Sequence, residues 1–188
     1  MRQDYPITAA RITTVAVLMA MNIALCAFGI PVPGGHLYLC DAVICLAALL
    51  LNPLDAFIVG GIGAFLGDLL FYPVPMFVSL VTHGLQAVAI SLIAHRTLRK
   101  KPYTASVIAV LVGAVIMVTG YTLGKCFIYS TPEYALMKLP YEIAQAALGA
   151  VLSIILYWKC GLHKLFKIQF SEKAFRAGGG KQQICMKN

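Results

Sequence analysis

Long apolar segments fill most of this chain, and proline-, glycine- or charge-rich connections separate them. A helix needs about 20 mostly apolar residues to cross the hydrocarbon core of a bilayer. All but the second segment reach or approach that length. The six segments are residues 11–30, 38–51, 54–71, 76–94, 105–129 and 141–158. They predict an all-α membrane protein that folds as a bundle of six transmembrane helices.

The composition supports this fold class. Of the 188 residues, 60% are hydrophobic and 12% are charged, against about 45–50% and about 25% in soluble domains. Soluble enzymes, secreted disulfide scaffolds and disordered tails are excluded by these values. We expect residues 1–160 to form one transmembrane substrate-binding domain and residues 161–188 to form a basic cytoplasmic tail.

Lysine and arginine gather in three places, which predicts the orientation of the bundle. The clusters are Arg2 with Arg11, Arg96 to Lys101, and Lys159 to Lys187. Short connections rich in Lys and Arg stay on the cytoplasmic side of a membrane. An even number of crossings puts all three clusters and both termini in the cytoplasm. The net charge of +8 fits a bacterial plasma membrane with anionic lipids better than nucleic-acid binding.

Ionisable groups are costly inside a membrane, so their positions are informative. In the predicted orientation they fall in the outer half of the bilayer. The candidate substrate-binding residues are Asp41, Asp68, His83, Gln86, Lys125, Glu142 and Gln145. Helical spacing puts His83 with Gln86, and Glu142 with Gln145, on shared faces. These faces predict a cavity open to the outside; the alternative is that the groups only pair with one another or reach for the interface.

No catalytic or nucleotide-binding pattern competes with this interpretation. The P-loop, H-E-x-x-H, G-x-S-x-G and H-x-E with C-x-x-C patterns do not occur. The six cysteines lie mostly in apolar runs, as packing residues do. We therefore expect no enzymatic activity, no cofactor and no metal site. A stand-alone transporter driven by a proton gradient, with Asp68, His83 and Glu142 as its relay, stays open as the alternative function.

A stripe of small residues marks the first apolar segment. Ala16, Ala20 and Ala24 recur at intervals of four and share one helical face. Small residues let helices approach one another closely in lipid. The stripe predicts either packing within the bundle or a flat surface on which a partner docks.

Short motifs follow one another between residues 31 and 86. They are PVPGG at 31–35, LCDAVI at 39–44, LAALLLNP at 46–53, GGIG at 60–63, DLL at 68–70, YP at 72–73 and HGLQ at 83–86. Together they resemble the S components of energy-coupling factor (ECF) transporters, in the group that captures vitamins and vitamin precursors. Two positions depart from the pattern, because many relatives have glycine in place of Cys40 and an acid in place of Gln86.

The resemblance implies a subunit of an ATP-driven importer. Such an S component binds its vitamin from outside and docks on a transmembrane coupling subunit that two cytoplasmic ATPases carry. The alanine stripe is the surface that the resemblance assigns to this contact. It also implies that the whole S component tips over in the membrane to release its substrate inward.

The connection after the first segment is a candidate lid, because prolines stiffen it and glycines let it hinge. Its residues are Pro33, Gly34, Gly35 and His36. The candidate site supplies three acids, one lysine and one histidine. This mixture suits a polar or cationic heterocycle, such as a pyridoxine-like or aminopyrimidine compound. Because Lys125 can hold a carboxylate, a pantothenate-like ligand stays open.

Overall fold

The computed structural model describes residues 9–33, 35–97 and 101–166, and most of them are helical. The helices are α1 (Ala9–Cys26), α2 (Cys40–Leu50), α3 (Pro53–Phe57), α4 (Gly63–Phe71), α5 (Met76–Leu92), α6 (Pro102–Gly124) and α7 (Pro132–Ile154). The π-helical turns η1 (Ile58–Ile62), η2 (Ile93–Thr97), η3 (Lys125–Tyr129) and η4 (Ile155–Lys159) extend α3, α5, α6 and α7. The strands β1 (Gly29–Val32) and β2 (Gly35–Tyr38) stand between α1 and α2.

Five helical segments are long and apolar enough to cross a membrane. They are Ala9–Cys26, Pro53–Phe71, Met76–Arg96, Pro102–Tyr129 and Pro132–Lys159. The remaining predicted segment forms α2, which has 11 residues, all of them buried. At 1.5 Å per residue α2 is about 16 Å long, which is half the thickness of the hydrocarbon core. The structure is thus that of a helical membrane protein with one short helix at its centre; the count of six crossings stays a prediction.

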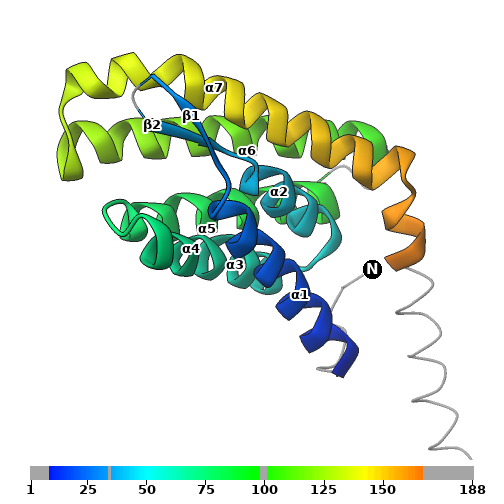
Figure 1. The fold of residues 1–188 in the computed structure, drawn as a ribbon. Helices are drawn as coiled ribbons and strands as arrows, with labels where there is room; N and C mark the ends of the chain where they lie inside the picture. Colours follow the sequence, from blue (N-terminus) through cyan, green and yellow to red (C-terminus); the bar gives the residue numbers. More distant parts are fainter. Residues whose placement is uncertain (1–8, 34, 98–100, 167–188) are drawn as a thin grey trace, which may run out of the picture.

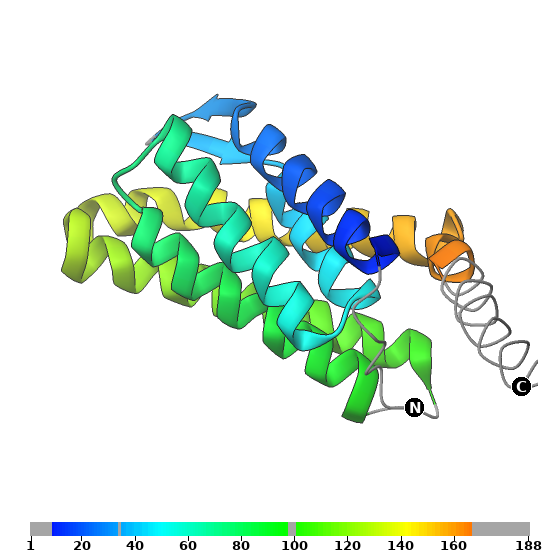
Figure 2. The same cartoon turned by 90° about the horizontal axis from the view of Figure 1, so that it is seen from below.

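The other helices surround α2 (Figure 1). α6 and α7 run along one side, α3 to α5 lie on the other, and α1 packs across α4 and α2. α5 contacts α6 most extensively, and α2 contacts α7. Seen from below, α1, the α3–α4 helix, α5 and α6 form a row of inclined neighbours (Figure 2). A continuous apolar core, built around residues 44–51, fills the space between these helices.

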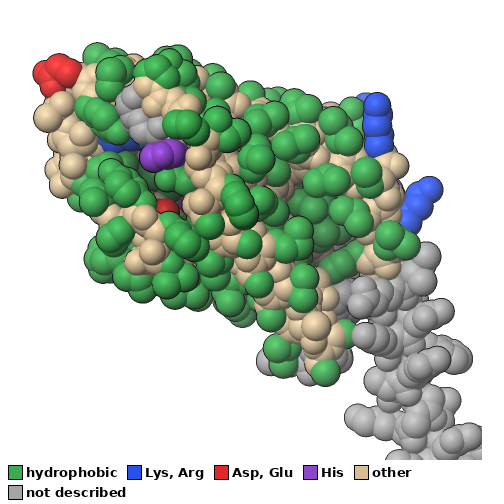
Figure 3. Space-filling view, viewed as in Figure 1, with side chains coloured by type: hydrophobic (Ala, Val, Ile, Leu, Met, Phe, Trp, Pro, Cys, Tyr) green, Lys and Arg blue, Asp and Glu red, His purple; other side chains and the backbone are tan. Residues whose placement is uncertain are grey.

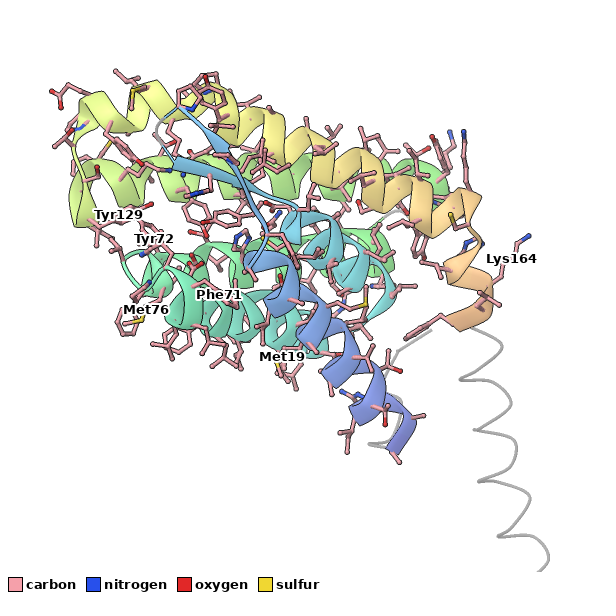
Figure 4. The ribbon with its side chains drawn as sticks, in the orientation of Figure 1. Met19, Phe71, Tyr72, Met76, Tyr129 and Lys164 are labelled. Atoms are coloured by element: carbon pink, nitrogen blue, oxygen red, sulfur yellow. The ribbon has the colours of Figure 1, made fainter. Side chains whose placement is uncertain are left out.

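The two ends of the bundle have different chemistry. We call one end the hairpin end; β1 and β2, the α4–α5 connection and the η3–α7 connection form it. We call the other the tail end; α1 and α6 begin there, and helical residues 162–166 follow η4 there. At the tail end the Arg11 guanidinium donates to both carboxylate oxygens of Asp55, at 2.6 and 2.9 Å. Lys164 projects outward there (Figure 4). Arg2, Arg99, Lys100 and the predicted tail beyond residue 166 lie outside the described residues.

A hairpin replaces the end of the first predicted helix. We expected that helix to reach Ile30, but α1 ends at Cys26 and residues 29–32 pair antiparallel with residues 35–38. The register aligns Gly29 with Tyr38. The candidate lid falls on this hairpin: Pro33 is in its turn, Gly35 and His36 belong to β2, and Gly34 lies outside the described residues.

The last long helix begins earlier than predicted. We expected it to start at Tyr141, but α7 starts at Pro132 and continues through Pro140. The Thr131 hydroxyl accepts a hydrogen bond from the Tyr134 N–H and caps the helix start. A proline within a transmembrane helix is tolerated because neighbouring helices compensate the lost hydrogen bond. Glu142 therefore lies about three turns into α7 instead of at its start.

α7 reaches the centre of the bundle at Gly149. A Cβ atom at this position would lie 2.7 Å from the Asp41 Cβ atom, which is closer than side chains normally come. The absence of a side chain thus lets α7 press against the first turn of α2. This close approach brings Gln145, one turn earlier in α7, next to the Asp41 carboxylate.

Candidate ligand-binding cavity

A cavity of about 210 Å³ opens at the hairpin end. Its wall takes residues from the end of α1, from β2 and from the start of α2, and from α4, α5, α6, η3 and α7. Figure 3 shows the hollow, with a histidine side chain at its rim, basic and acidic side chains inside it, and a mostly hydrophobic surface around it. The cavity therefore gathers the polar groups of helices that are far apart in sequence.

Tyrosine side chains form much of the cavity wall. They are Tyr38, Tyr72, Tyr121, Tyr129 and Tyr134. Tyr72 follows α4 and Tyr129 ends η3, and the two lie near each other at the hairpin end (Figure 4). In the hairpin, burial raises the pKa of Tyr38 to about 12, so its phenol stays neutral at physiological pH. Such a wall offers flat π faces and hydroxyl groups to a planar ligand.

Sequence reasoning did not include these tyrosines among the candidate binding residues. Tyr121 and Tyr129 carried a signal, because each lies four residues from Lys125 and shares a helical face with it. Tyr38 belongs to the hairpin, and Tyr72 and Tyr134 stand at helix ends, where aromatic residues are ordinary at a membrane interface. Their convergence on one cavity depends on how the helices pack.

A buried ion pair spans the cavity between η3 and α7. Lys125 and Glu142 are 2% and 4% exposed, and the Lys125 ammonium contacts the Glu142 oxygen Oε1. The second oxygen, Oε2, is buried and accepts no hydrogen bond from the described part of the chain. An acceptor of this kind is available to a ligand that donates a hydrogen bond.

Asp68 presents a second carboxylate to the cavity. It accepts a hydrogen bond from the Ser79 hydroxyl, whose oxygen lies 2.5 Å from the Tyr121 hydroxyl. Lys138 lines the same cavity from α7. Two carboxylates, Asp68 and Glu142, therefore face two ammonium groups, Lys125 and Lys138, so the formal charges of Asp, Glu, Lys and Arg in the wall cancel.

Asp41 is the centre of a hydrogen-bonded chain behind the wall. Its oxygen Oδ2 accepts from Gln145 Nε2 at 2.6 Å, and Oδ1 accepts from Gln86 Nε2 at 3.3 Å. Gln145 Oε1 accepts in turn from the backbone N–H of Tyr38 at 2.9 Å. On the other side, His83 Nδ1 lies 2.7 Å from Gln86 Oε1. Asp41 and Gln86 are 1% exposed.

Of the seven predicted binding residues, five line the cavity and two lie directly behind it. Asp68, His83, Lys125, Glu142 and Gln145 line the cavity, as does His36 from the candidate lid. Asp41 and Gln86 lie behind it and join its wall through the hydrogen-bonded chain. Among the residues that the structure describes, no group of three or more His, Cys, Asp or Glu is arranged to hold a metal ion.

The alanine stripe lies on a different surface. Ala16, Ala20 and Ala24 are exposed and do not line the cavity. The opposite face of α1 packs on the bundle, where the buried Asn22 donates to the carbonyl of Val59 at 2.8 Å. The stripe is thus an exposed row of small residues on a helix whose opposite face packs against the bundle.

Comparison with known proteins agrees with this architecture. Residues 7–161 match the family described as "ECF-type riboflavin transporter, S component". An uncharacterized protein of Pyrococcus woesei is 30% identical over 125 residues, which cover 65% of this chain and 82% of that protein. The family match covers the whole helical bundle, and S components are substrate-binding membrane subunits of transporters, not enzymes. The chain belongs to the S components of ECF-type riboflavin transporters.

Proposed function

We propose that this S component captures a neutral, planar heterocyclic vitamin from outside the cell and delivers it to an ATPase-coupled module. The observation that carries the proposal is the tyrosine-walled cavity at the hairpin end, in which the formal charges of acids and lysines cancel. When the charges of the wall cancel, a neutral or zwitterionic ligand can bind and no charge is then buried without a partner. The tyrosine rings supply stacking surfaces for a flat ring system.

Riboflavin is the first ligand to test, since the matched family is named for it and it is neutral and planar. A pyridoxine-like or aminopyrimidine compound fits the hydrogen-bonding groups but brings a positive charge when protonated. A pantothenate-like carboxylate requires Lys125 to leave its pairing with Glu142. The charge balance of the wall therefore favours the neutral ligand over the other two classes.

The proposed orientation puts the hairpin end outside and both termini in the cytoplasm, with α2 counted as the sixth crossing. Basic side chains support it, since Arg11, Arg96, Lys101, Lys159 and Lys164 all belong to the tail end. Lys and Arg in short connections favour the cytoplasmic side. In this orientation the cavity faces the medium, as a capture subunit requires.

The proposed partners are a transmembrane coupling subunit and two cytoplasmic ATPases. The exposed face of Ala16, Ala20 and Ala24 supports this, because small side chains allow close contact between helices in lipid. The cavity lies elsewhere, so a partner can dock on α1 while a ligand is bound.

The first prediction concerns the purified chain alone. Native mass spectrometry is expected to show one bound small molecule or, after ligand removal, one riboflavin bound per chain. The fluorescence of riboflavin should be quenched on binding, since tyrosine rings would contact the flavin. Competition with pyridoxine, an aminopyrimidine and pantothenate ranks the alternatives. Tight binding of pantothenate without competition by riboflavin would contradict the neutral-ligand proposal.

The second prediction separates this proposal from a stand-alone proton-coupled transporter. Asp68, His83 and Glu142 lie at the hairpin end, while apolar residues such as Ile44, Leu49 and Ile90 occupy the core beyond them. A proton relay needs polar groups along its path. Liposomes that contain this chain alone should therefore take up no riboflavin when a pH gradient is applied. Gradient-driven uptake by the chain alone would support the alternative.

A further inference from the structure

The hydrogen-bonded chain behind the cavity has a direction that two of its groups impose. A carboxylate only accepts hydrogen bonds and a backbone N–H only donates them, whereas a glutamine amide does both. Asp41 supplies the carboxylate and Tyr38 supplies the N–H, with Gln145 between them. Gln145 must therefore turn its Oε1 to Tyr38 and its Nε2 to Asp41. Both neighbours fix the same orientation of this amide.

The second arm of the chain has no such double constraint. Gln86 stands between Asp41 and His83, and an imidazole nitrogen either donates or accepts. Asp41 requires the Nε2 of Gln86 to face it, which leaves Oε1 facing His83 Nδ1 at 2.7 Å. Because Oε1 only accepts, Nδ1 must carry a proton. In the neutral ring Nε2 then has a lone pair and no proton.

The unprotonated edge of His83 is the one that a ligand meets. His83 lines the cavity, whereas Gln86 and Asp41 lie behind the wall. Nδ1 is turned toward Gln86, so Nε2 lies on the opposite edge of the ring. The His83 ring also packs against the Tyr121 ring in a T-shaped pair, with centroids 5.3 Å apart, which holds the imidazole in place.

Asp68 is the group that opposes this arrangement, since an ionised carboxylate near His83 favours a proton on Nε2. Within the described chain, however, Asp68 takes its hydrogen bond from Ser79 and none from His83. Direct hydrogen bonds outweigh a carboxylate at longer range in setting an imidazole tautomer. The hydrogen bond to Gln86 therefore decides where the proton lies, and the Asp41 carboxylate, with Oδ1 3.8 Å from Nδ1, favours the same position.

We propose that Asp41 is a positioning residue that, through Gln86, holds the proton of His83 on Nδ1 and so presents Nε2 to the cavity as a hydrogen-bond acceptor. It follows that the ligand offers an N–H or O–H donor at this point of the cavity. Only this second statement rests on the proposed function; the tautomer is a property of the chain without ligand.

The test is nitrogen NMR of the full chain in lipid nanodiscs at neutral pH, without ligand and with ¹⁵N-labelled histidine. Protonated and unprotonated imidazole nitrogens have widely separated shifts, and the spectrum of His83→Gln identifies the signals of His83. The wild type should show a protonated Nδ1 and an unprotonated Nε2. A proton on Nε2, or on both nitrogens, would overturn the proposal.

Asp41→Asn gives the sharper result. Gln145 still presents its Nε2 to residue 41, because the Tyr38 N–H fixes it, so the new amide must turn its oxygen to Gln145 and its NH₂ to Gln86. Gln86 then reverses, and the proton of His83 moves to Nε2. Gln86→Met breaks the relay without changing Asp41, whose Oδ1 lies 3.8 Å from His83 Nδ1, and should give a mixture of tautomers in which the proton on Nδ1 is the more populated form. Asp55→Asn, at the tail end, is the matched control and should leave the wild-type pattern.

Persistence of the wild-type tautomer in both Asp41→Asn and Gln86→Met would show that Asp41 does not set it. In the ligand arm, Asp41→Asn should weaken riboflavin binding about 5- to 150-fold, because two donors would then face each other in a buried site. If riboflavin fails to bind the wild type, the ligand proposal fails while the tautomer is still measured. If riboflavin binds but the tautomer is wrong, only the present inference fails.

Discussion

Tryptophan in place of Ala20 should abolish stable association with the coupling subunit while the isolated chain keeps its ligand affinity. Ala20 is exposed in the middle of the alanine stripe and does not line the cavity. An indole there holds the partner helix away from the α1 backbone, and the contacts that small residues permit in lipid are lost. Ligand affinity should change by no more than about twofold, as for surface substitutions away from a site.

Co-expression with a tagged coupling subunit and its ATPases measures the association, and ligand titration of the purified variant measures the affinity. Ala147→Trp is the matched control, because Ala147 is an exposed alanine on α7, outside the stripe and the cavity. The control should co-purify normally. Normal recovery of the complex with Ala20→Trp would show that the docking surface lies elsewhere.

Much of the site could be predicted because ionisable groups inside a membrane are expensive. That cost makes Asp68, Lys125 and Glu142 conspicuous in apolar segments, and the structure places them around one cavity. The cost does not say which polar groups face the ligand and which support others. Asp41 carries the same sequence signal, yet it lies behind the wall, where α7 approaches α2 closely at Gly149 and the amides of Gln86 and Gln145 bind its carboxylate.

The fold could be predicted where the length of an apolar segment determines a helix. It could not be predicted where hydrogen bonding between two backbone segments determines a strand pair. Residues 27–30 continue the apolar run of α1, and hydropathy does not distinguish a short strand from another helical turn. The hairpin becomes visible only through the pairing of Gly29 with Tyr38. The start of the last helix is misplaced in the opposite way, since the predicted first residue, Tyr141, lies within α7. The sequence likewise marks α2 as a short apolar segment but does not show that the other helices surround it.

Removing either partner of the Lys125–Glu142 ion pair should destabilise the protein, whereas removing both should not. Both side chains are almost completely buried. A single change, Lys125→Met or Glu142→Leu, leaves one charge buried without its partner, at a cost of about 3–5 kcal/mol. In a chain of this size that cost lowers Tm by about 10 °C. The double variant replaces the pair with apolar groups of similar volume and should recover most of the loss.

The ligand affinity of these variants should not change in parallel with their thermal stability. The single variants remove one member of the polar pair that faces the cavity and the double variant removes both. Each should therefore bind riboflavin at least about 100-fold more weakly, even when the double variant is as stable as the wild type. Thermal unfolding in detergent and ligand titration measure the two properties on the same preparations. Arg11→Met with Asp55→Leu repeats the cycle at the tail end and should leave binding unchanged. A stable double variant that still binds like the wild type would make the Lys125–Glu142 pair a structural element of the bundle and remove it from the ligand site.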